Sequence, residues 1–430
     1  MQGKALPGFR DFYPEELALR NHIFATWRAV ATRYGFVEYD GPPLEPLELY
    51  TQKSGDEIVQ QLYAFQDKGD REVALRPEMT PTLARMVGAR AQSLKKPIRW
   101  FSIPQLFRYE RQQRGRLREH FQLNLDLIGE SGPLADAELI AAAIDILRAF
   151  GFGPGDVRAR VSDRRVLRTL LMGGGVAESQ LATAFAAIDR SERVPRDALV
   201  DGLQKAGCSV AAIDAVFETA SLRGMPAVTQ ALARVKGGEE AGQGLAQAHS
   251  ALGTMGLGEF VDIDVTIVRG LAYYTGIVFE LFDAGKDLRA ICGGGRYDGL
   301  LKALGGVDLP ALGFGMGDVV LGELLREKHA ASAQASARLD AFLVAVSGED
   351  QAPVLKLAHD LRDRGVAVEF ALRPQAIRKQ LELAVARGAP RAVIVGPEER
   401  ATGKAVVRDL QAGTETKVSF EALLNGFFKK

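Results

Sequence analysis

The chain has few of the residues that mark disulfide-rich, metal-binding or membrane proteins. It contains two cysteines and five histidines in 430 residues, and Cys208 and Cys292 lie far apart. Such a composition excludes a disulfide framework, gives no zinc-ligand spacing and favours a reducing compartment. No apolar run approaches the roughly 18 residues that span a bilayer, so no membrane partner is expected.

An excess of charge of either sign is also absent. The 54 basic and 54 acidic residues give a formal net charge of +0, so a nucleic-acid partner would have to bind through local basic patches. The length is enough for two or three domains, and 47% apolar with 25% charged residues is ordinary for a globular enzyme. The acidic, turn-rich N-terminus does not resemble a targeting peptide, and we expect a cytoplasmic protein.

Helical and strand patterns alternate in residues 1–166. A helix is predicted after Pro14, because a proline and two glutamates suit a helix N-terminus, and Gly35 ends it. Residues 134–150 have the periodicity of a strong amphipathic helix. Residues 157–163 alternate as a strand does.

The pattern changes after this first part of the chain. Residues 167–256 are rich in Ala, Leu, Gln and Glu, with almost no strand pattern, which predicts a helical insertion. Strand patterns return in residues 257–327, and a helix is expected after Gly317. Small and polar residues at 328–338 are typical of a linker. In residues 339–430 strands alternate with helices, which predicts a small α/β domain with a mainly parallel sheet.

Residues 107–129 contain the most informative pattern, two strands joined by an arginine-rich loop. In the second strand Gln122, Asn124 and Asp126 alternate with apolar residues, so polar side chains form one row. The loop region contains Glu110 and five arginines, which are Arg108, Arg111, Arg114, Arg116 and Arg118. Arginine binds phosphate with a planar fork, so the segment indicates a pocket for a phosphate-bearing ligand and a small polar one. A solvated surface loop is the alternative.

Two further segments combine charged and polar residues. In LRPEMT, Glu78 and Thr80 could share a face and bind a cationic amine, or Thr80 could cap the following helix. In RGLAYYTG, Arg269 could stabilise developing negative charge and a tyrosine hydroxyl could bond a polar ligand. Alternatively, Tyr273 and Tyr274 are aromatic residues of the core and its rim.

Two glycine-rich segments, residues 292–300 and 313–318, allow close approach of a ligand to the backbone, although tight turns also use such glycines. Neither fits a phosphate-loop or dinucleotide pattern. The histidines are scattered, and no Ser–His–Asp or Cys–His arrangement is present in the sequence pattern. We therefore predict no metal bound by the protein itself.

Together these segments resemble the histidyl-tRNA synthetases, a family of class II aminoacyl-tRNA synthetases. The matching segments follow the family's order and are PGFRDFYP, GFVEYDGPP (motif 1), LRPEMT, FRYERQQRGRLREHFQLNLD (motif 2), VRGLAYYTG with GGRYDGL (the histidine-specific motifs) and GFGMGD (the motif 3 position). The histidine-specific pair is the most selective, because motif 2 alone indicates only class II.

The resemblance implies an α+β catalytic domain with an antiparallel sheet of the class II type. The sequence would supply this domain in two parts, with the helical insertion between them, followed by a C-terminal α/β anticodon-binding domain. The implied activity is ATP-dependent ligation of L-histidine to tRNA(His) through histidyl-adenylate, with Mg²⁺ accompanying ATP. The implied assembly is a homodimer formed through motif 1, residues 35–46.

The resemblance also implies roles for single residues. Arg108 would bind the α-phosphate and carboxylate region, and Arg269 would act on the α-phosphate as charge develops. The amino group and imidazole of histidine would contact Glu78, Thr80, Gln122, Asp126, Tyr273 and Tyr274. The ATP-binding residues would be Arg108, Glu110, Arg116, His120 and Phe121.

Three positions depart from the family pattern. Val320 stands where motif 3 normally supplies an arginine, and His120 stands where a phenylalanine stacks on adenine. Because these two positions would normally sandwich the base, we expect ATP to be held differently, with Phe121 or another arginine helping. The third departure is Ala272, where aspartate is commoner.

A non-catalytic relative is the alternative function. Such a protein would bind histidine as a regulatory subunit in histidine biosynthesis, and the missing motif 3 arginine is its best support. The C-terminal block and the presence of Arg108, Arg269 and Asp126 argue against it.

Overall fold

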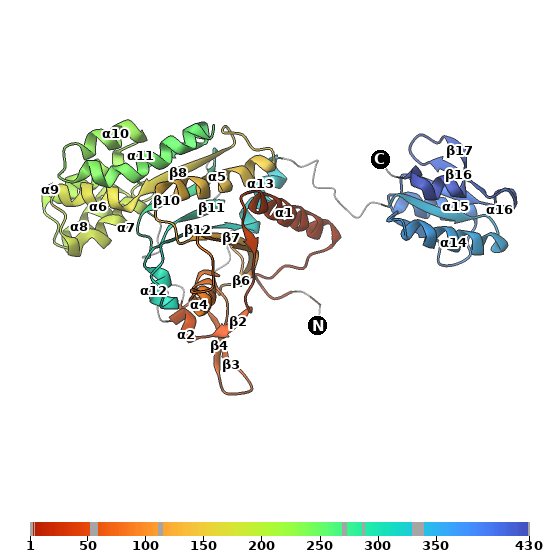
Figure 1. The fold of residues 1–430 in the computed structure, drawn as a ribbon, viewed down its shortest axis with the longest axis horizontal. Helices are drawn as coiled ribbons and strands as arrows, with labels where there is room; N and C mark the ends of the chain where they lie inside the picture. Colours follow the sequence, from red (N-terminus) through yellow and green to blue (C-terminus); the bar gives the residue numbers. More distant parts are fainter. Residues whose placement is uncertain are drawn as a thin grey trace. The chain divides into compact units, whose positions relative to one another are not determined.

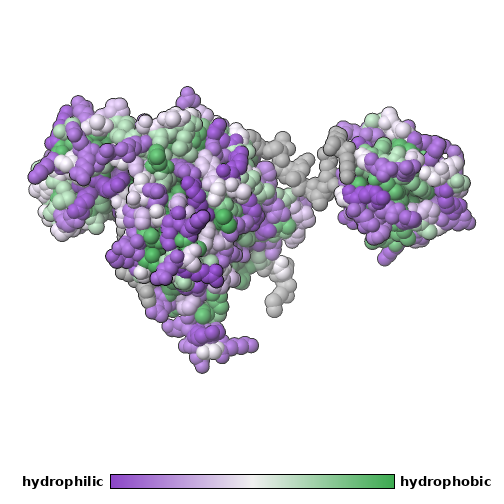
Figure 2. Space-filling model, in the orientation of Figure 1, coloured by the Kyte–Doolittle hydropathy of each residue, from purple (hydrophilic) through white to green (hydrophobic). Residues whose placement is uncertain are grey.

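The computed structural model describes residues 3, 5–51, 59–110, 115–268, 273–285, 289–328 and 339–428. The chain forms two compact units, Met1–Ala333 and Gln334–Lys430 (Figure 1). On the visible face of each unit, hydrophilic side chains dominate and hydrophobic ones lie in patches between them (Figure 2). Within the described ranges, no helix combines the length and the apolar character that crossing a membrane requires.

A large sheet forms the centre of the first unit, with the strand order β1-β5-β7-β12-β11-β10-β8-β9 and β6 paired to β7. The strands are β1 (Val37–Glu38), β5 (Ile98–Ser102), β6 (Gln105–Phe107), β7 (Glu119–Ile128), β8 (Val157–Asp163), β9 (Val261–Ile263), β10 (Ile277–Asp283), β11 (Cys292–Arg296) and β12 (Ala311–Gly317). The pairs between β5 and β8 are antiparallel, and the outer pairs β1–β5 and β8–β9 are parallel. The antiparallel sheet is as expected.

One face of this sheet carries the main core. The side chains of Leu123, Leu125 and Leu127 on β7 are fully buried there, in one cluster with Trp27 and Ile140. The last two residues belong to α1 (Pro14–Arg33) and α5 (Pro133–Ala149), the helices predicted from the sequence. A third helix, α13 (Asp318–Lys328), packs into the same cluster and directly follows β12. The apolar row of β7 therefore faces helices, which leaves its polar row for the other face.

The predicted helical stretch is helical in the structure. Its helices are α6 (Arg164–Gly173), α7 (Leu181–Arg190), α8 (Arg196–Lys205), α9 (Val210–Ser221), α10 (Gly224–Leu232) and α11 (Gly238–Thr254). The first of them starts directly after β8, because the Asp163 side chain accepts a hydrogen bond from the backbone N–H of Arg165 and caps the helix.

A small three-stranded sheet flanks the large one, in the order β2-β4-β3. It consists of β2 (Leu44–Pro46), β3 (Tyr63–Gln66) and β4 (Glu72–Leu75), with the helices α2 (Glu48–Thr51), α4 (Thr80–Arg90) and α12 (Leu300–Gly305) nearby. Buried Arg76, at the end of β4, donates to Asp40 Oδ1 at 2.7 Å and to the carbonyl of Gln105 at 3.0 Å. Arg76 thus ties the motif 1 segment to the hairpin strands.

The second unit is a five-stranded sheet in the order β14-β13-β15-β16-β17. Its elements are β13 (Ala341–Ala345), α14 (Gln351–Arg362), β14 (Val368–Phe370), α15 (Ile377–Ala386), β15 (Arg391–Val395), α16 (Pro397–Thr402), β16 (Lys404–Asp409), β17 (Glu415–Ser419) and α17 (Phe420–Ala422). The βαβαβ order is confirmed. The sheet is mixed rather than mainly parallel, because β16 and β17 follow connections too short for a parallel crossover and pair antiparallel.

A buried ion pair joins the large sheet to α5. The Arg296 guanidinium on β11 lies 2.6 Å from Asp136 Oδ2, and both side chains are almost fully buried. Arg296 also donates to the carbonyl of Glu130 at 2.9 Å. These bonds position β11, whose other end lies at the candidate site described below.

Replacing Arg296 with methionine should lower the free energy of unfolding of this unit by about 3–5 kcal/mol, because Asp136 would remain as an unpaired buried carboxylate. Urea unfolding monitored by tryptophan fluorescence measures this, since both tryptophans lie in the first unit. Lys302→Met is the matched control, because the Lys302–Asp308 pair is exposed and should contribute less than about 1 kcal/mol. Equal effects of the two changes would contradict the prediction.

Candidate functional site

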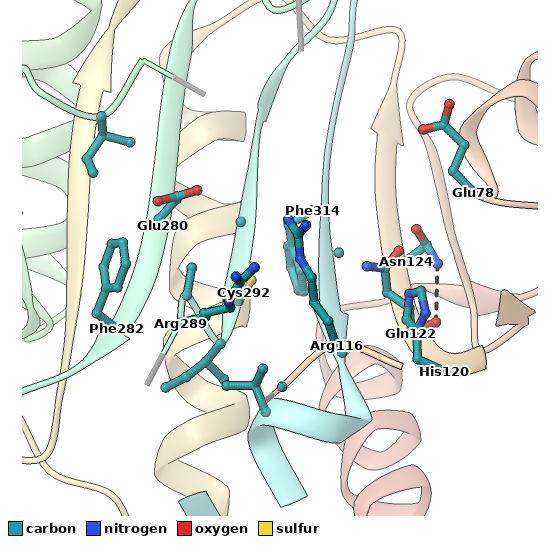
Figure 3. A pocket seen from close by; sticks show the side chains of 18 of the residues that line it. Glu78, Arg116, His120, Gln122, Asn124, Glu280, Phe282, Arg289, Cys292 and Phe314 are labelled. Atoms are coloured by element: carbon teal, nitrogen blue, oxygen red, sulfur yellow. Dashed lines mark hydrogen bonds between the residues drawn. The ribbon is translucent and has the colours of Figure 1, made fainter. Parts of the chain in front are cut away.

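A cavity of about 940 Å³ lies over the polar face of the large sheet. Strands β7, β10, β11 and β12 form its floor, and the segment after β6 and the start of α13 form its rim. Figure 3 shows side chains from these elements pointing toward the same space. The cavity is large enough for a nucleotide together with an amino acid.

The polar row of β7 lines one side of the cavity. His120, Gln122, Asn124 and Asp126 alternate along the strand and so project to the same face (Figure 3 labels the first three). The Asn124 side-chain amide donates to the carbonyl of Gln122 at 3.1 Å, which fixes its orientation. The row predicted from the sequence therefore faces a cavity and not bulk solvent.

Glycines on β12 provide the room for this row. Gly313 pairs with Asp126 and Gly315 with Asn124. A Cβ at Gly313 would lie 2.1 Å from Asp126 Oδ1, and one at Gly315 would lie 2.8 Å from Gln122 Cδ. These glycines lie within a strand and not in a turn, so the turn alternative does not apply to them. Any larger residue would collide with the polar row.

Asp126 and three tyrosines line one end of the cavity. The hydroxyl of Tyr297 donates a hydrogen bond to Asp126 Oδ1. Burial raises the pKa of the Asp126 carboxyl to about 7, and the hydrogen bond from Tyr297 opposes that rise. The ring of Tyr273 lies 5.0 Å from that of Tyr274 and 6.0 Å from that of Tyr297. This end can accept a small ligand with ring nitrogens, because it combines aromatic faces with a buried carboxyl.

Guanidinium groups gather at the other end. Arg116 lies 3.0 Å from Glu110 Oε2, and Arg108 lies 3.9 Å from Glu110 Oε1. The Arg108 Nε also donates to the carbonyl of Pro77 at 2.9 Å, which holds its fork at the cavity wall. Arg289, just before β11, lines the same part of the cavity. Several cations beside one carboxylate suit a polyanionic ligand.

His120 is uncharged in this setting. Burial, followed by the charges of Arg108 and Arg10, lowers the pKa of its imidazole to about 3. A neutral, flat ring therefore faces the cavity at neutral pH, and such a ring can pack against a nucleobase.

Phe121 lies on the opposite face of β7. Its ring packs against Phe24 at 5.2 Å and Phe12 at 6.2 Å, with the Arg20 guanidinium 5.0 Å above it. The two-residue period of the strand turns it toward α1. The predicted contact of Phe121 with ATP is therefore not supported, since its side chain points away from the cavity.

Glu78 and Thr80 both line the cavity, from the turn that leads into α4. The helix begins at Thr80 itself, with Met79 at the N-cap position and no side-chain cap bond. The capping alternative for Thr80 thus finds no support, and the two side chains are placed as a binding pair would be.

The structure brings most predicted site residues to this one cavity, namely Glu78, Thr80, Arg108, Glu110, Arg116, His120, Gln122, Asp126, Tyr273 and Tyr274. Arg269 lies outside the described residues, as do Arg111, Arg114 and Ala272. Among the described residues, no group of three His, Cys, Asp or Glu side chains could hold a metal ion.

Among the other residues that line the cavity are Asn124, Glu280, Arg289 and Tyr297, to which the sequence patterns assigned no role of their own. Asn124 was visible in the polar row of β7, and Tyr297 lies in the GGRYDGL segment. Glu280 lies in a strand with regular alternation. No local pattern marks Arg289, whose place depends on the pairing of distant strands.

Two protein families match in succession along the chain. Residues 8–317 match the family "Histidyl-tRNA synthetase", and residues 340–430 match the "Anticodon binding domain". A histidine–tRNA ligase from Opitutus terrae is 46% identical over 434 residues, covering 99% of this chain and 98% of that protein. The chloroplastic/mitochondrial histidine–tRNA ligase of Arabidopsis thaliana is 40% identical, covering 97% of this chain and 85% of its own.

Solved structures agree with these matches. The histidyl-tRNA synthetase of Nostoc sp. PCC 7120 superposes with a TM-score of 0.84 at 25% identity, covering 99% of both chains. A Bacillus halodurans protein described as an ATP phosphoribosyltransferase regulatory subunit/histidyl-tRNA synthetase has a TM-score of 0.76 at 22% identity and covers 92% of this chain and 99% of its own, so it shows only the fold. From the whole-length relatives and the two ordered family matches, the chain belongs to the histidyl-tRNA synthetase family.

Proposed function

We propose that this chain is a histidine–tRNA ligase that uses ATP to join L-histidine to tRNA(His). The observation that carries the proposal is the single cavity that combines the Asp126 and Tyr297 end with the arginine end. One end suits an imidazole and the other suits a triphosphate. Family membership supplies the reaction that uses both ligands.

In the first step, an oxygen of the histidine carboxylate attacks the α-phosphorus of ATP, and pyrophosphate leaves. In the second step, a hydroxyl at the 3′ end of the tRNA attacks the activated carbonyl, and AMP leaves as the hydroxyl proton passes to its phosphate. The first step needs no general base, because the carboxylate is already ionised and alignment and positive charge supply most of the rate. Arg108 would neutralise the α-phosphate, and Arg269 would have the same role.

Histidine would be recognised at the end of the cavity that contains Asp126. Glu78, Thr80 and Gln122 would bind the α-amino group, with Tyr273 beside the ring. Asp126 and Tyr274 would bind the two imidazole nitrogens. An amino acid that lacks these nitrogens would leave buried polar groups unpaired, which discriminates strongly.

The nucleotide end would use Glu110, Arg116 and His120. Mg²⁺ would enter as part of its complex with ATP, where it neutralises phosphate charge. Glu280 projects into the cavity from β10 (Figure 3) and offers the kind of oxygen ligand that Mg²⁺ prefers.

The domain division proposed from the sequence fits this activity. Residues 1–166 and 257–327 would make the catalytic domain, and residues 167–256 the helical insertion. A linker at 328–338 would join it to residues 339–430, which would bind the anticodon region of the tRNA. We also propose that the protein works in the cytoplasm.

Pyrophosphate exchange with ATP, Mg²⁺ and each amino acid in turn tests the proposal. Exchange should occur with histidine and with no other amino acid, because only histidine satisfies both ends of the cavity. If no amino acid supported exchange and histidine binding were still measurable, the protein would instead be a regulatory histidine-binding protein.

Histidine binding should weaken as the pH falls through about 7. The free protein protonates Asp126 there, because its pKa is raised to about 7, and the neutral carboxyl accepts an imidazole N–H more weakly than the ionised carboxylate does. Tyr297→Phe removes a hydrogen bond that favours the ionised form, so the midpoint should move to higher pH. Calorimetric titration of histidine at several pH values measures the affinity and its midpoint pH for the parent protein and for Tyr297→Phe.

Asp126→Asn is the control for this pH dependence, because the imidazole of the ligand itself has a pKa of about 6.5. This variant should bind histidine more weakly and retain only the titration of the ligand. A midpoint near pH 7 that survives in Asp126→Asn would show that another group is responsible.

We further propose a homodimer formed through the motif 1 segment, residues 35–46. Val37 and Leu44 in this segment are 63% and 37% exposed, and neighbouring Phe65 is 50% exposed. A second copy would cover these apolar side chains. Light scattering in solution should give the mass of two chains, and the mass of one chain would contradict the proposal.

A further inference from the structure

The sheet brings two segments together that are distant in sequence. Strands β11 and β12 are antiparallel, with Cys292 paired to Met316. The residues just before β11 therefore lie beside the residues just after β12. Arg289 precedes this pair by three positions and Val320 follows it by four, so both lie at the same edge of the cavity.

Gly115 marks where the two segments meet the arginine-rich loop. A Cβ on Gly115 would lie 3.4 Å from Val320 Cγ2 and 4.0 Å from Arg289 Cδ. The aliphatic stem of Arg289 and the valine side chain therefore both lie close to Gly115. The residue after Gly115 is Arg116, so two guanidinium groups from separate elements approach one end of the cavity (Figure 3).

Several arginines lie close together at this end, among carboxylates that also line the cavity. Burial lowers the pKa of Arg289, and the neighbouring Arg116 and Arg193 lower it further, while Glu110 opposes them. Glu110 lies 3.0 Å from Arg116, and Asp189 lies 3.5 Å from Arg193. An anionic ligand would relieve the repulsion between these groups.

We propose that Arg289 is an ATP-binding residue whose guanidinium, together with Arg116, binds the triphosphate and supplies the cation that Val320 does not. This inference rests on the proposed function and extends it. The family resemblance places an arginine at position 320, on the helix after β12. In this chain the positive charge comes instead from the segment just before β11, and it reaches the same place because the register of β11 and β12 brings it there. Pyrophosphate, which carries the same phosphates, uses the same contact.

Steady-state pyrophosphate exchange with Arg289→Ala tests the contact. The KM values for ATP and for pyrophosphate should each rise about 10-fold to 100-fold, as expected for loss of a charge-assisted hydrogen bond. The KM for histidine should stay unchanged, because Asp126 and the tyrosines lie at the other end. Arg190→Ala, an exposed arginine at the end of α7, is the control for loss of one positive charge and should match the parent protein.

A second variant separates the contact from simple misfolding. Arg289→Ala combined with Val320→Arg should recover most of the lost ATP and pyrophosphate affinity, because the new arginine starts from the adjacent position. Unchanged KM values in Arg289→Ala would overturn the inference. A higher KM for ATP with an unchanged KM for pyrophosphate would also overturn it, since the contact would then be to the base or ribose.

Direct calorimetric binding of Mg²⁺–ATP keeps the two proposals apart. If the parent protein failed to exchange pyrophosphate, the ligase function would fail. The parent should nevertheless bind Mg²⁺–ATP about 10-fold to 100-fold more tightly than Arg289→Ala. Equal affinities would overturn the role of Arg289.

Discussion

The two-residue alternation of β7 is the constraint on which the rest of the first unit depends. Its leucines must face α1 and α5, because burying each such side chain stabilises the fold by about 1.5–3 kcal/mol, and exposing all three would lose that free energy. A strand cannot turn one face inward without turning the other outward. The polar row is therefore fixed over the cavity by the packing of the apolar row.

Placing a polar row on a central strand has consequences for its neighbours. The next strand, β12, contributes glycines opposite the row, because a side chain at Gly313 would occupy the space of the Asp126 carboxyl. The burial that shapes this space also raises the pKa of Asp126. Since its unfolded pKa is lower, the group favours the folded state less as pH rises from the unfolded value to about 7. The free site is thus held at some expense of stability, which a bound imidazole can offset.

Local patterns predicted the elements well where a single physical rule decided them. The helix after Pro14, the helix near residues 134–150 and the strand at 157–163 all follow from periodicity and end signals. The parallel sheet of the second unit was only half right, because the connections after β15 are too short for crossovers. Phe121 was assigned to ATP from its motif, although the alternation of the same strand already placed it on the apolar face.

The sequence by itself determined the family, the order of the motifs and the alternation that separates a core face from a ligand face, because these are properties of neighbouring residues. Only the tertiary structure decided which distant residues complete the site. Tyr297 reaches Asp126 across 171 positions, and Arg289 reaches Gly115 and Val320 through the pairing of β11 with β12. Strand register sets those contacts, and register is fixed by the packing of the whole sheet rather than by any local pattern.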